Sequence, residues 1–261
     1  MNLEYLSKAI ITVPLLPVLY VQALNVRKKV PSLPEAEGPN GLVQQGSGTP
    51  FRLAVLGEST MAGIGVQTHE EGFGGTLAKA LAQQINRPID WTIIAKSGYT
   101  AKQIRQDLVP QLSSTPYDLI VIGTGGNDAF SLNIPRKWKK EIRLLLESLR
   151  QKQPHAPIVF GNMPPIREFP AFPPLMQWSL GSLVEILGKE LGNITAKEDN
   201  CWYYGSVISL QDWTERLNVD AQPSDYFSDG VHPSKLTYQT WAKDLANYIQ
   251  KQEILSPGRS K

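Results

Sequence analysis

Hydrophobic residues in most of the chain form short continuous runs that alternate with stretches of wider, regular spacing. Runs such as Phe51–Leu56 and Tyr117–Gly123 are typical of strands buried on both faces of a sheet. In Trp138–Gln151 the apolar residues recur every three or four positions, which is typical of a helix with one buried side. The alternation begins at Phe51 and continues almost to the end of the chain.

Alternating strands and helices form βαβ units, which build a parallel sheet with helices on both faces. The sequence therefore predicts an α/β fold with a five-stranded parallel sheet. The predicted strands are Phe51–Leu56, Trp91–Ala95, Tyr117–Gly123, Pro157–Asn162 and one within Trp202–Ile208. The predicted helices are Gly75–Asn86, Thr100–Leu112, Trp138–Gln151, Leu175–Leu191 and one that follows an N-cap at Ser234 and runs to about Gln250.

The first 29 residues form an apolar arm. Ala9–Leu24 carries no charge, and Lys8 and the Arg27-Lys28-Lys29 triplet bracket it. The run is short for a bilayer span, and two prolines interrupt it. We expect membrane association through residues 9–24, with the basic triplet on the cytoplasmic side. The alternatives are the signal peptide of a periplasmic or secreted protein and an arm packed on its own domain in a cytoplasmic protein.

Residues 30–50 are rich in Pro, Gly, Ser and Gln and are predicted to be a linker. They separate the arm from a single domain at 51–250, and residues 251–261 form a tail. The net charge of +2 gives no basic stripe for a nucleic acid. A single cysteine, Cys201, excludes an intrachain disulfide and a multi-cysteine zinc site, so we expect it to be a small buried hydrophobe.

Glycine-rich and polar segments lie where the ligand crevice of such a sheet is expected, beyond the carboxyl ends of the strands. These segments are Gly57–Thr60, Lys96–Tyr99, Gly123–Asp128 and, before the last helix, Asp229–Ser234. Each segment alone would be read as a turn or a helix cap. Four of them at one edge of the sheet indicate a functional site.

The residues of these segments suit acyl transfer. The hydroxyl of Ser59 becomes a useful nucleophile when a base such as His232 removes its proton. Asp229 can accept a hydrogen bond from the imidazole and fix its tautomer. The backbone N–H groups of Ser59 and Gly98 and the side-chain amide of Asn127 can donate to the oxyanion.

Taken in order, the segments resemble the four sequence blocks of the SGNH (GDSL-type) hydrolases. The matching residues are Gly57-x-Ser59, Gly98, Gly125-x-Asn127-Asp128 and Asp229-x-x-His232. The resemblance extends from about Phe51 to Tyr248, and the Pro-rich Met163–Pro170 resembles a bacterial subgroup of these esterases.

The resemblance implies a three-layer α/β/α, flavodoxin-like fold and hydrolysis of esters or thioesters without a cofactor. By position it implies that Ser59 is the nucleophile that forms the acyl-enzyme, His232 its base and Asp229 the partner of that base. It also implies that Gly98 and Asn127 donate to the oxyanion. One residue departs from the family pattern. Glu58 stands where the family usually has Asp, and we expect its longer side chain to change hydrogen bonding at the turn.

The expected substrate is a small-molecule or lipid-like ester. A carbohydrate O-deacetylase, a thioesterase and a lysophospholipase fit the same motifs. A catalytically inactive flavodoxin-like binding module is the alternative of a different class, motivated by Glu58. Among other residues, we expect His69 to be solvated, with the rim of the site as a second position, and Phe172 and Trp178 to line an acyl pocket or pack in the core.

Overall fold

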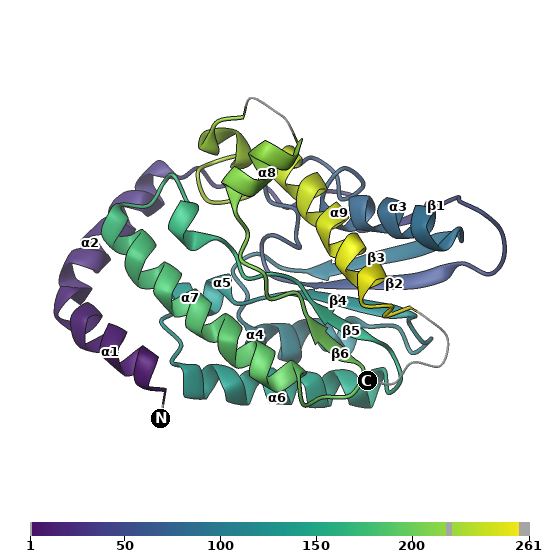
Figure 1. Cartoon of the computed structure of the whole chain (residues 1–261), viewed down its shortest axis with the longest axis horizontal. Coiled ribbons are helices and arrows are strands. Elements are labelled where there is room, and N and C mark those ends of the chain that lie inside the picture. The colour runs from purple at the N-terminus through teal and green to yellow at the C-terminus, as the bar shows by residue number, and fades with distance from the viewer. Residues whose placement is uncertain (1, 218–220, 256–261) are drawn as a thin grey trace.

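A single six-stranded sheet forms the centre of the molecule, in the order β1-β3-β2-β4-β5-β6 (Figure 1). The computed structural model describes residues 2–217 and 221–255. Strands β2 to β6 run parallel, as predicted, and β1 pairs antiparallel with β3 at the edge. The strands are β1 Asn40–Val43, β2 Phe51–Gly57, β3 Ile89–Ala95, β4 Leu119–Gly123, β5 Ile158–Phe160 and β6 Cys201–Tyr203.

Strand β1 corrects the predicted count of five strands and the prediction that 30–50 is only a linker. It has two large apolar residues, Leu42 and Val43, and it begins with Asn40-Gly41, a pair that is typical of turns. It joins the sheet through backbone pairing with β3 and through close packing of Gly41 on the Trp91 indole, where a Cβ would collide with the ring. Backbone pairing at a sheet edge leaves little hydrophobic pattern in the sequence.

Helices cover both faces of the sheet, which confirms the predicted α/β class (Figure 1). Helices α3 and α9 pack together on one face, and α4, α6 and α7 lie on the other. The helices are α1 Leu3–Thr12, α2 Leu16–Lys29, α3 Phe73–Ile85, α4 Ala101–Gln103, α5 Gly126–Phe130, α6 Pro135–Lys152, α7 Pro174–Thr195, α8 Leu210–Leu217 and α9 Lys235–Lys251. Ser234 caps α9 as predicted, by accepting a hydrogen bond from the N–H of Thr237.

The predicted helix Thr100–Leu112 is broken in the structure. After α4 the chain forms a π-helical turn at Ile104–Leu108 and a 3-10 turn at Val109–Gln111. Pro110 has no N–H to donate to the preceding turn, so a regular α-helix cannot continue through it. The apolar face is still buried, because Ile104, Leu108 and Leu112 all contact the core.

The core lies between the sheet and its helices. Strand β4 is buried along its whole length, as expected for a strand covered on both faces. Trp138 of α6 is fully buried and donates its indole N–H to the Leu187 carbonyl of α7 at 3.0 Å. Cys201 is buried in β6, as predicted.

The N-terminal arm is helical from Leu3 to Lys29, with a 3-10 turn at Val13–Leu15, the site of Pro14. By length and composition this helix could cross a membrane: its mean hydropathy reaches 1.8, and little of it is buried. It runs along α7 at one edge of the molecule (Figure 1). The side chain of Lys189 donates to Glu4 at 2.8 Å, and Asn2 donates to Glu190 at 2.8 Å.

Candidate active site

The turn that carries Ser59 follows the carboxyl end of β2 without a break. Gly57 lies so close to β4 that a Cβ there would collide with the carbonyl oxygen of Gly123. The N–H of Glu58 donates to that same oxygen at 3.1 Å, and the N–H of Ala62 donates to the Glu58 carbonyl at 3.0 Å. The chain is therefore tightly turned at residues 58–62, and it leaves Ser59 half-buried at the crevice.

The sheet register brings the three segments after β2, β3 and β4 together. Gly57 pairs with Ala95 of β3 on one side and with Gly123 of β4 on the other. Ala95, Gly57 and Gly123 are the last residues of their strands and lie in one row across the sheet. Ser59, Gly98 and Asn127 come two to four residues after these strand ends. The crevice rule thus places three of the five expected site residues at one edge.

Direct hydrogen bonds also connect these three segments. Asn127 donates its side-chain amide to the Tyr99 carbonyl at 3.2 Å, next to Gly98. The Glu58 carboxylate accepts from the N–H of Gly126 at 2.7 Å and from the N–H of Asn127 at 2.9 Å. Glu58 therefore joins the turn of Ser59 to the start of α5, which carries Asn127.

The loop at Gly98 is held by a residue that the sequence analysis assigned to a linker. Glu35 accepts from the N–H of Ser97 at 2.8 Å and pairs with the Lys96 ammonium at 3.0 Å. Burial raises the pKa of Glu35, but these two donors outweigh it and lower the pKa below its ordinary value. Gly98 is exposed and has a φ of +82°, which favours glycine. No sequence motif marks Glu35, because its contacts are formed only in the folded chain.

Asp229 and His232 form a direct pair. The Nδ1 atom of His232 lies 2.7 Å from Oδ2 of Asp229, whose side chain is fully shielded from solvent. The other carboxylate oxygen accepts from the N–H of Val231 at 2.9 Å and from the N–H of His232 at 2.7 Å. Burial raises the pKa of Asp229, and the donors from His232 and Val231 lower it below its ordinary value. A carboxylate held this way fixes the imidazole with Nδ1 protonated and Nε2 available as a base.

The loop of His232 packs on the turn of Ser59. The Ser228 hydroxyl lies 3.2 Å from the Gly65 carbonyl, and the Tyr238 hydroxyl donates to the Ile64 carbonyl at 2.8 Å. Gly65 must be small here, because a Cβ would collide with Ser228. These contacts join α9 and the loop before it to the loop after β2. Thr60 of the first predicted segment and Val231 and Pro233 of the fourth line one cavity, so the two segments lie close together.

Two acidic side chains are buried beneath this site. Burial raises the pKa of Glu58 to about 8, against the two N–H donors, and the nearby charge of Asp128 adds to the rise. Burial also raises the pKa of Asp128, which accepts from the N–H of Ala101 at 2.8 Å and from the Asn133 amide at 2.6 Å. Folding therefore favours the protonated form of Glu58, compared with an unfolded chain.

We expect Glu58→Gln to lower the free energy of unfolding by about 1–3 kcal/mol at pH 6, because its amide places a donor against one of the two N–H groups. The pKa of Glu58 rises from 4.5 to about 8 on folding, so its contribution to stability is complete below pH 4.5 and is lost as pH rises to about 8. The difference between wild type and variant should therefore shrink from pH 6 to pH 8 in denaturant titrations. Glu58→Asp keeps a titrating carboxyl group and serves as the control. If the difference in unfolding free energy between wild type and Glu58→Gln stays constant or grows from pH 6 to pH 8, the raised pKa of Glu58 is contradicted.

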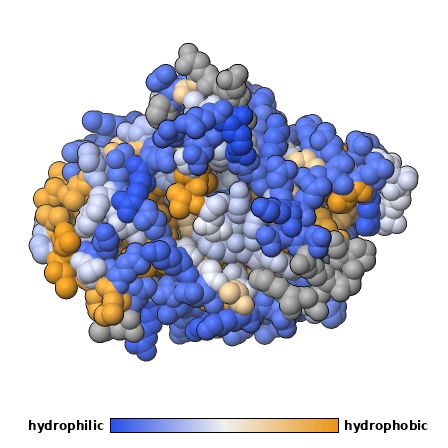
Figure 2. Space-filling model, viewed as in Figure 1, coloured by the Kyte–Doolittle hydropathy of each residue, from blue (hydrophilic) through white to orange (hydrophobic). Residues whose placement is uncertain are grey.

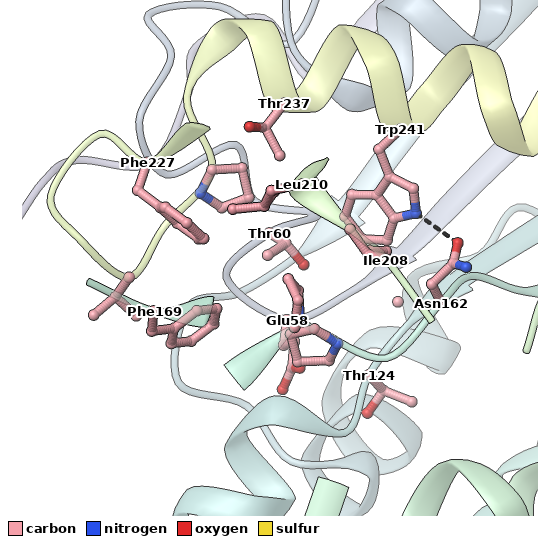
Figure 3. Close-up of a pocket in the computed structure, with 15 residues that line it drawn as sticks. Glu58, Thr60, Thr124, Asn162, Phe169, Ile208, Leu210, Phe227, Thr237 and Trp241 are labelled. Carbon is pink, nitrogen blue, oxygen red and sulfur yellow. Dashed lines mark hydrogen bonds between the residues drawn. The ribbon is translucent and has the colours of Figure 1, made fainter. Parts of the chain in front are cut away.

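A small apolar cavity of about 30 Å³ lies next to these residues (Figure 3). Glu58 and Thr60, which flank Ser59, and Val231 and Pro233, which flank His232, form part of its wall. The rest of the wall is mostly apolar and includes Pro164, Pro165, Phe169, Ile208, Leu210, Phe227 and Trp241. The surroundings of the predicted nucleophile and base are therefore mostly apolar on this side. Among the residues that the structure describes, no group of three or more His, Cys, Asp or Glu side chains could hold a metal ion.

Three other predictions can be compared with the structure. His69 is only 5% exposed, so the expectation of a solvated side chain is wrong. Its backbone N–H donates to the Glu37 carbonyl at 2.9 Å, its ring lies beside Gly63, and burial lowers its pKa. Phe172 is buried against Phe169, which lines the cavity. Trp178 instead lies under Lys8 of the arm, with the ammonium 5.2 Å from its ring.

A family comparison covers the same part of the chain. The model of the GDSL-like lipase/acylhydrolase family matches residues 55–240, which include Ser59, Gly98, Asn127, Asp229 and His232. The chain belongs to this family. As a GDSL-like acylhydrolase it is an enzyme that acts on ester bonds, in agreement with the resemblance found in the sequence.

Solved structures share the fold of this GDSL-like hydrolase. A lipase from a goat rumen metagenome is 17% identical, with a TM-score of 0.56, over 80% of this chain and 99% of its own. The protein TesA is 20% identical, with a TM-score of 0.57, over 78% of this chain and 99% of its own. A carbohydrate esterase of family 2 from Corynascus thermopiles is 14% identical, with a TM-score of 0.55, over 80% of this chain and 68% of its own. No curated protein matches the chain.

Proposed function

We propose that the protein is a serine esterase that hydrolyses carboxylic esters through an acyl-enzyme on Ser59. The Asp229–His232 pair, held at 2.7 Å on a loop that packs against the turn of Ser59, is the observation that carries the proposal. Nε2 of His232 takes the hydroxyl proton as Oγ of Ser59 bonds to the acyl carbon. His232 then returns the proton to the leaving alcohol, and a water molecule activated by the same base releases the acid.

The oxyanion of the tetrahedral intermediate is stabilised by three donors in this proposal. They are the backbone N–H groups of Ser59 and Gly98 and the side-chain amide of Asn127. The hydrogen bond from Asn127 to the Tyr99 carbonyl and the bond from its backbone N–H to Glu58 support this role, because together they fix the amide before substrate binds. Preorganised donors of this kind avoid reorganisation in the transition state.

We expect Asn127→Ala to lower kcat by about 10²–10³-fold with little change in KM, since an oxyanion donor acts mainly in the transition state. The backbone N–H of residue 127 still reaches Glu58 in the variant, so the fold should be retained. Steady-state kinetics and a thermal melt check both points. A kcat close to that of wild type would remove Asn127 from the oxyanion site.

The apolar wall beside the predicted nucleophile and base supports an ester with an apolar acyl group or a lipid-like alcohol as substrate. The test is hydrolysis of p-nitrophenyl acetate, butyrate, octanoate and palmitate by the full-length protein. We expect turnover, with kcat/KM higher for the longer apolar chains than for acetate. A preference for acetylated sugars would assign the same chemistry to an O-deacetylase, and a preference for acyl thioesters or lysophospholipids would assign it to those substrates. No turnover on any ester would favour the binding module without activity.

We also propose that the apolar arm keeps the protein at a membrane with its N-terminus intact. The supporting observation is a helix over Leu3–Lys29 that is long and apolar enough to cross a membrane and is little buried. We expect the full-length protein in the membrane fraction at low and high salt, released by detergent, with the intact mass of the whole chain. A protein found wholly in the soluble fraction, or shortened by the length of the arm, would contradict this part of the proposal.

A further inference from the structure

Large hydrophobic side chains that are exposed gather in two segments of the described chain. Nine lie on the arm, and three more, Phe130, Leu132 and Ile134, lie at the end of α5 and just after it. Only Leu42 and Val207 lie elsewhere among the residues that the structure describes. Figure 2 shows the apolar atoms of the arm along the edge of the molecule formed by α1 and α2. The exposed residues of the arm are Leu3, Ile10, Ile11, Val13, Leu16, Val18, Tyr20, Val21 and Leu24.

The arm is bound to the domain along one side, and this leaves its other side apolar and exposed. Tyr5, Leu19 and Val26 pack against the core, and the polar contacts of Asn2 and Glu4 tie its first turn to α7. A helix fixed in this way lies on the surface of the domain. It suits insertion into the plane of a bilayer interface, as amphipathic helices do.

The second apolar segment lies close to the first. Glu190 of α7 accepts from Asn2 at the start of the arm and also pairs with Lys139 of α6 at 3.3 Å. The segment 130–134 leads directly into α6, and Phe130 contacts Phe172, which lies just before α7 begins. Both apolar segments therefore lie beside α6 and α7.

Cationic side chains border both apolar segments. Arg136, Lys137 and Lys140 are exposed on the first turns of α6, immediately after Ile134. The Arg27-Lys28-Lys29 triplet is exposed at the end of α2. Apolar side chains beside exposed cations match the interface of a bilayer that contains anionic lipids.

Both apolar segments lie a few residues along the chain from residues of the candidate site. Phe130 follows Asn127 by three residues on the same short helix. At the other segment, α2 ends six residues before Glu35, which holds Ser97 and Lys96 beside Gly98. A bilayer that contacted both segments would lie next to the rim of the crevice.

We propose that the exposed apolar face of the arm and the segment 130–134, with the cations that border them, form one docking surface for an anionic lipid bilayer, from which the enzyme takes its ester substrate. The docking itself is independent of the esterase chemistry. The statement about the substrate rests on the proposed function.

The test uses a variant that removes apolar surface without weakening the fold. Leu132 has a φ of +52°, which Asn adopts more readily than Leu, and Ile134 is the N-cap of α6, where Ser is preferred. Leu132→Asn/Ile134→Ser should therefore be at least as stable as wild type. The matched control is Leu42→Ser/Val207→Ser, which removes the two exposed apolar side chains outside the surface.

The measurement compares hydrolysis of a fluorogenic acyl ester embedded in vesicles of phosphatidylcholine and phosphatidylglycerol with hydrolysis of soluble p-nitrophenyl acetate. For the Leu132→Asn/Ile134→Ser variant we expect the rate on vesicles to fall by about tenfold or more and the soluble rate to stay unchanged. The control should match wild type on both. Equal rates of variant and wild type on vesicles would overturn the proposal, and so would an equal loss on both substrates.

Vesicle co-sedimentation tests docking without relying on activity. Arg136→Gln/Lys140→Gln should weaken binding to phosphatidylglycerol vesicles about fivefold or more at low salt and should not change binding to pure phosphatidylcholine. A protein that hydrolyses no ester but shows this binding pattern would contradict the proposed function alone. Self-association in lipid-free buffer that Leu132→Asn/Ile134→Ser abolishes, with unchanged binding to vesicles, would assign the surface to a second copy of the chain and overturn the proposal.

Discussion

Ser59→Ala should abolish ester hydrolysis while the protein remains folded. The acyl-enzyme needs the Oγ atom of Ser59, and no remaining group at this position can bond to the acyl carbon. Removal of a nucleophilic serine typically lowers kcat by about 10⁵-fold or more and leaves only the catalysis that binding and the oxyanion donors provide. Steady-state hydrolysis of p-nitrophenyl butyrate measures the effect.

The control for this variant is Ser97→Ala, which removes an exposed hydroxyl from the neighbouring loop and keeps the backbone bond to Glu35. It should keep wild-type turnover. Both variants should melt at the temperature of the wild type, because Ser59 is half-buried in a turn held by backbone bonds of its neighbours. Residual turnover above about one hundredth of wild type in Ser59→Ala would rule out this serine as the nucleophile.

Asp229→Asn should cause the second largest loss, about 10³–10⁴-fold in kcat. Both carboxylate oxygens of Asp229 accept hydrogen bonds, one from the His232 ring and the other from two backbone N–H groups. An amide has a single acceptor oxygen. If that oxygen faces the backbone, its NH₂ group faces Nδ1 of His232, so Nε2 carries the proton and cannot act as the base.

The other orientation of the amide places its NH₂ group against the N–H groups of Val231 and His232, which destabilises the loop. Either outcome lowers kcat, and the second also lowers the melting temperature. Asp225→Asn is the matched control, because Asp225 is exposed and its carboxylate accepts from Gln222 away from the imidazole. Asp229→Asn with the kcat of the control would show that the imidazole needs no carboxylate partner.

The sequence predicts where the candidate residues lie because their expected positions depend on strand ends. Ser59, Gly98 and Asn127 follow three adjacent parallel strands, and the register of Gly57 with Ala95 and Gly123 brings those ends together. Strand runs buried on both faces are visible as continuous apolar segments. The position of the crevice therefore follows from the hydrophobic pattern and one topological rule.

Features that depend on contacts between distant segments could not be predicted in this way. Strand β1 joins the sheet by backbone pairing, and Glu35 holds the Gly98 loop through a contact across 62 positions of the chain. His69 is polar and lies next to two glutamates, which suggested solvent, yet the fold buries it. In each case the decisive partner lies elsewhere in the sequence.

Glu58 stands where the family usually has Asp, and the structure shows what the longer side chain contacts. Both oxygens of its carboxylate are used by the first N–H groups of α5, so the longer side chain still joins the turn of Ser59 to Asn127. Its carboxyl group is fully buried and has a raised pKa. The sequence motif shows that Glu stands where the family usually has Asp. Only the folded structure shows which N–H groups its carboxyl group binds.

Labelling with a fluorophosphonate probe, followed by mass spectrometry of the peptides, tests the central claim most directly. The probe forms a covalent phosphonyl ester with an activated serine and expels fluoride. We predict one adduct per chain, located on Ser59 and lost in Ser59→Ala, and much slower labelling in Asp229→Asn. No adduct on a protein that hydrolyses esters, or an adduct on another serine that accounts for the turnover, would contradict the assignment of Ser59.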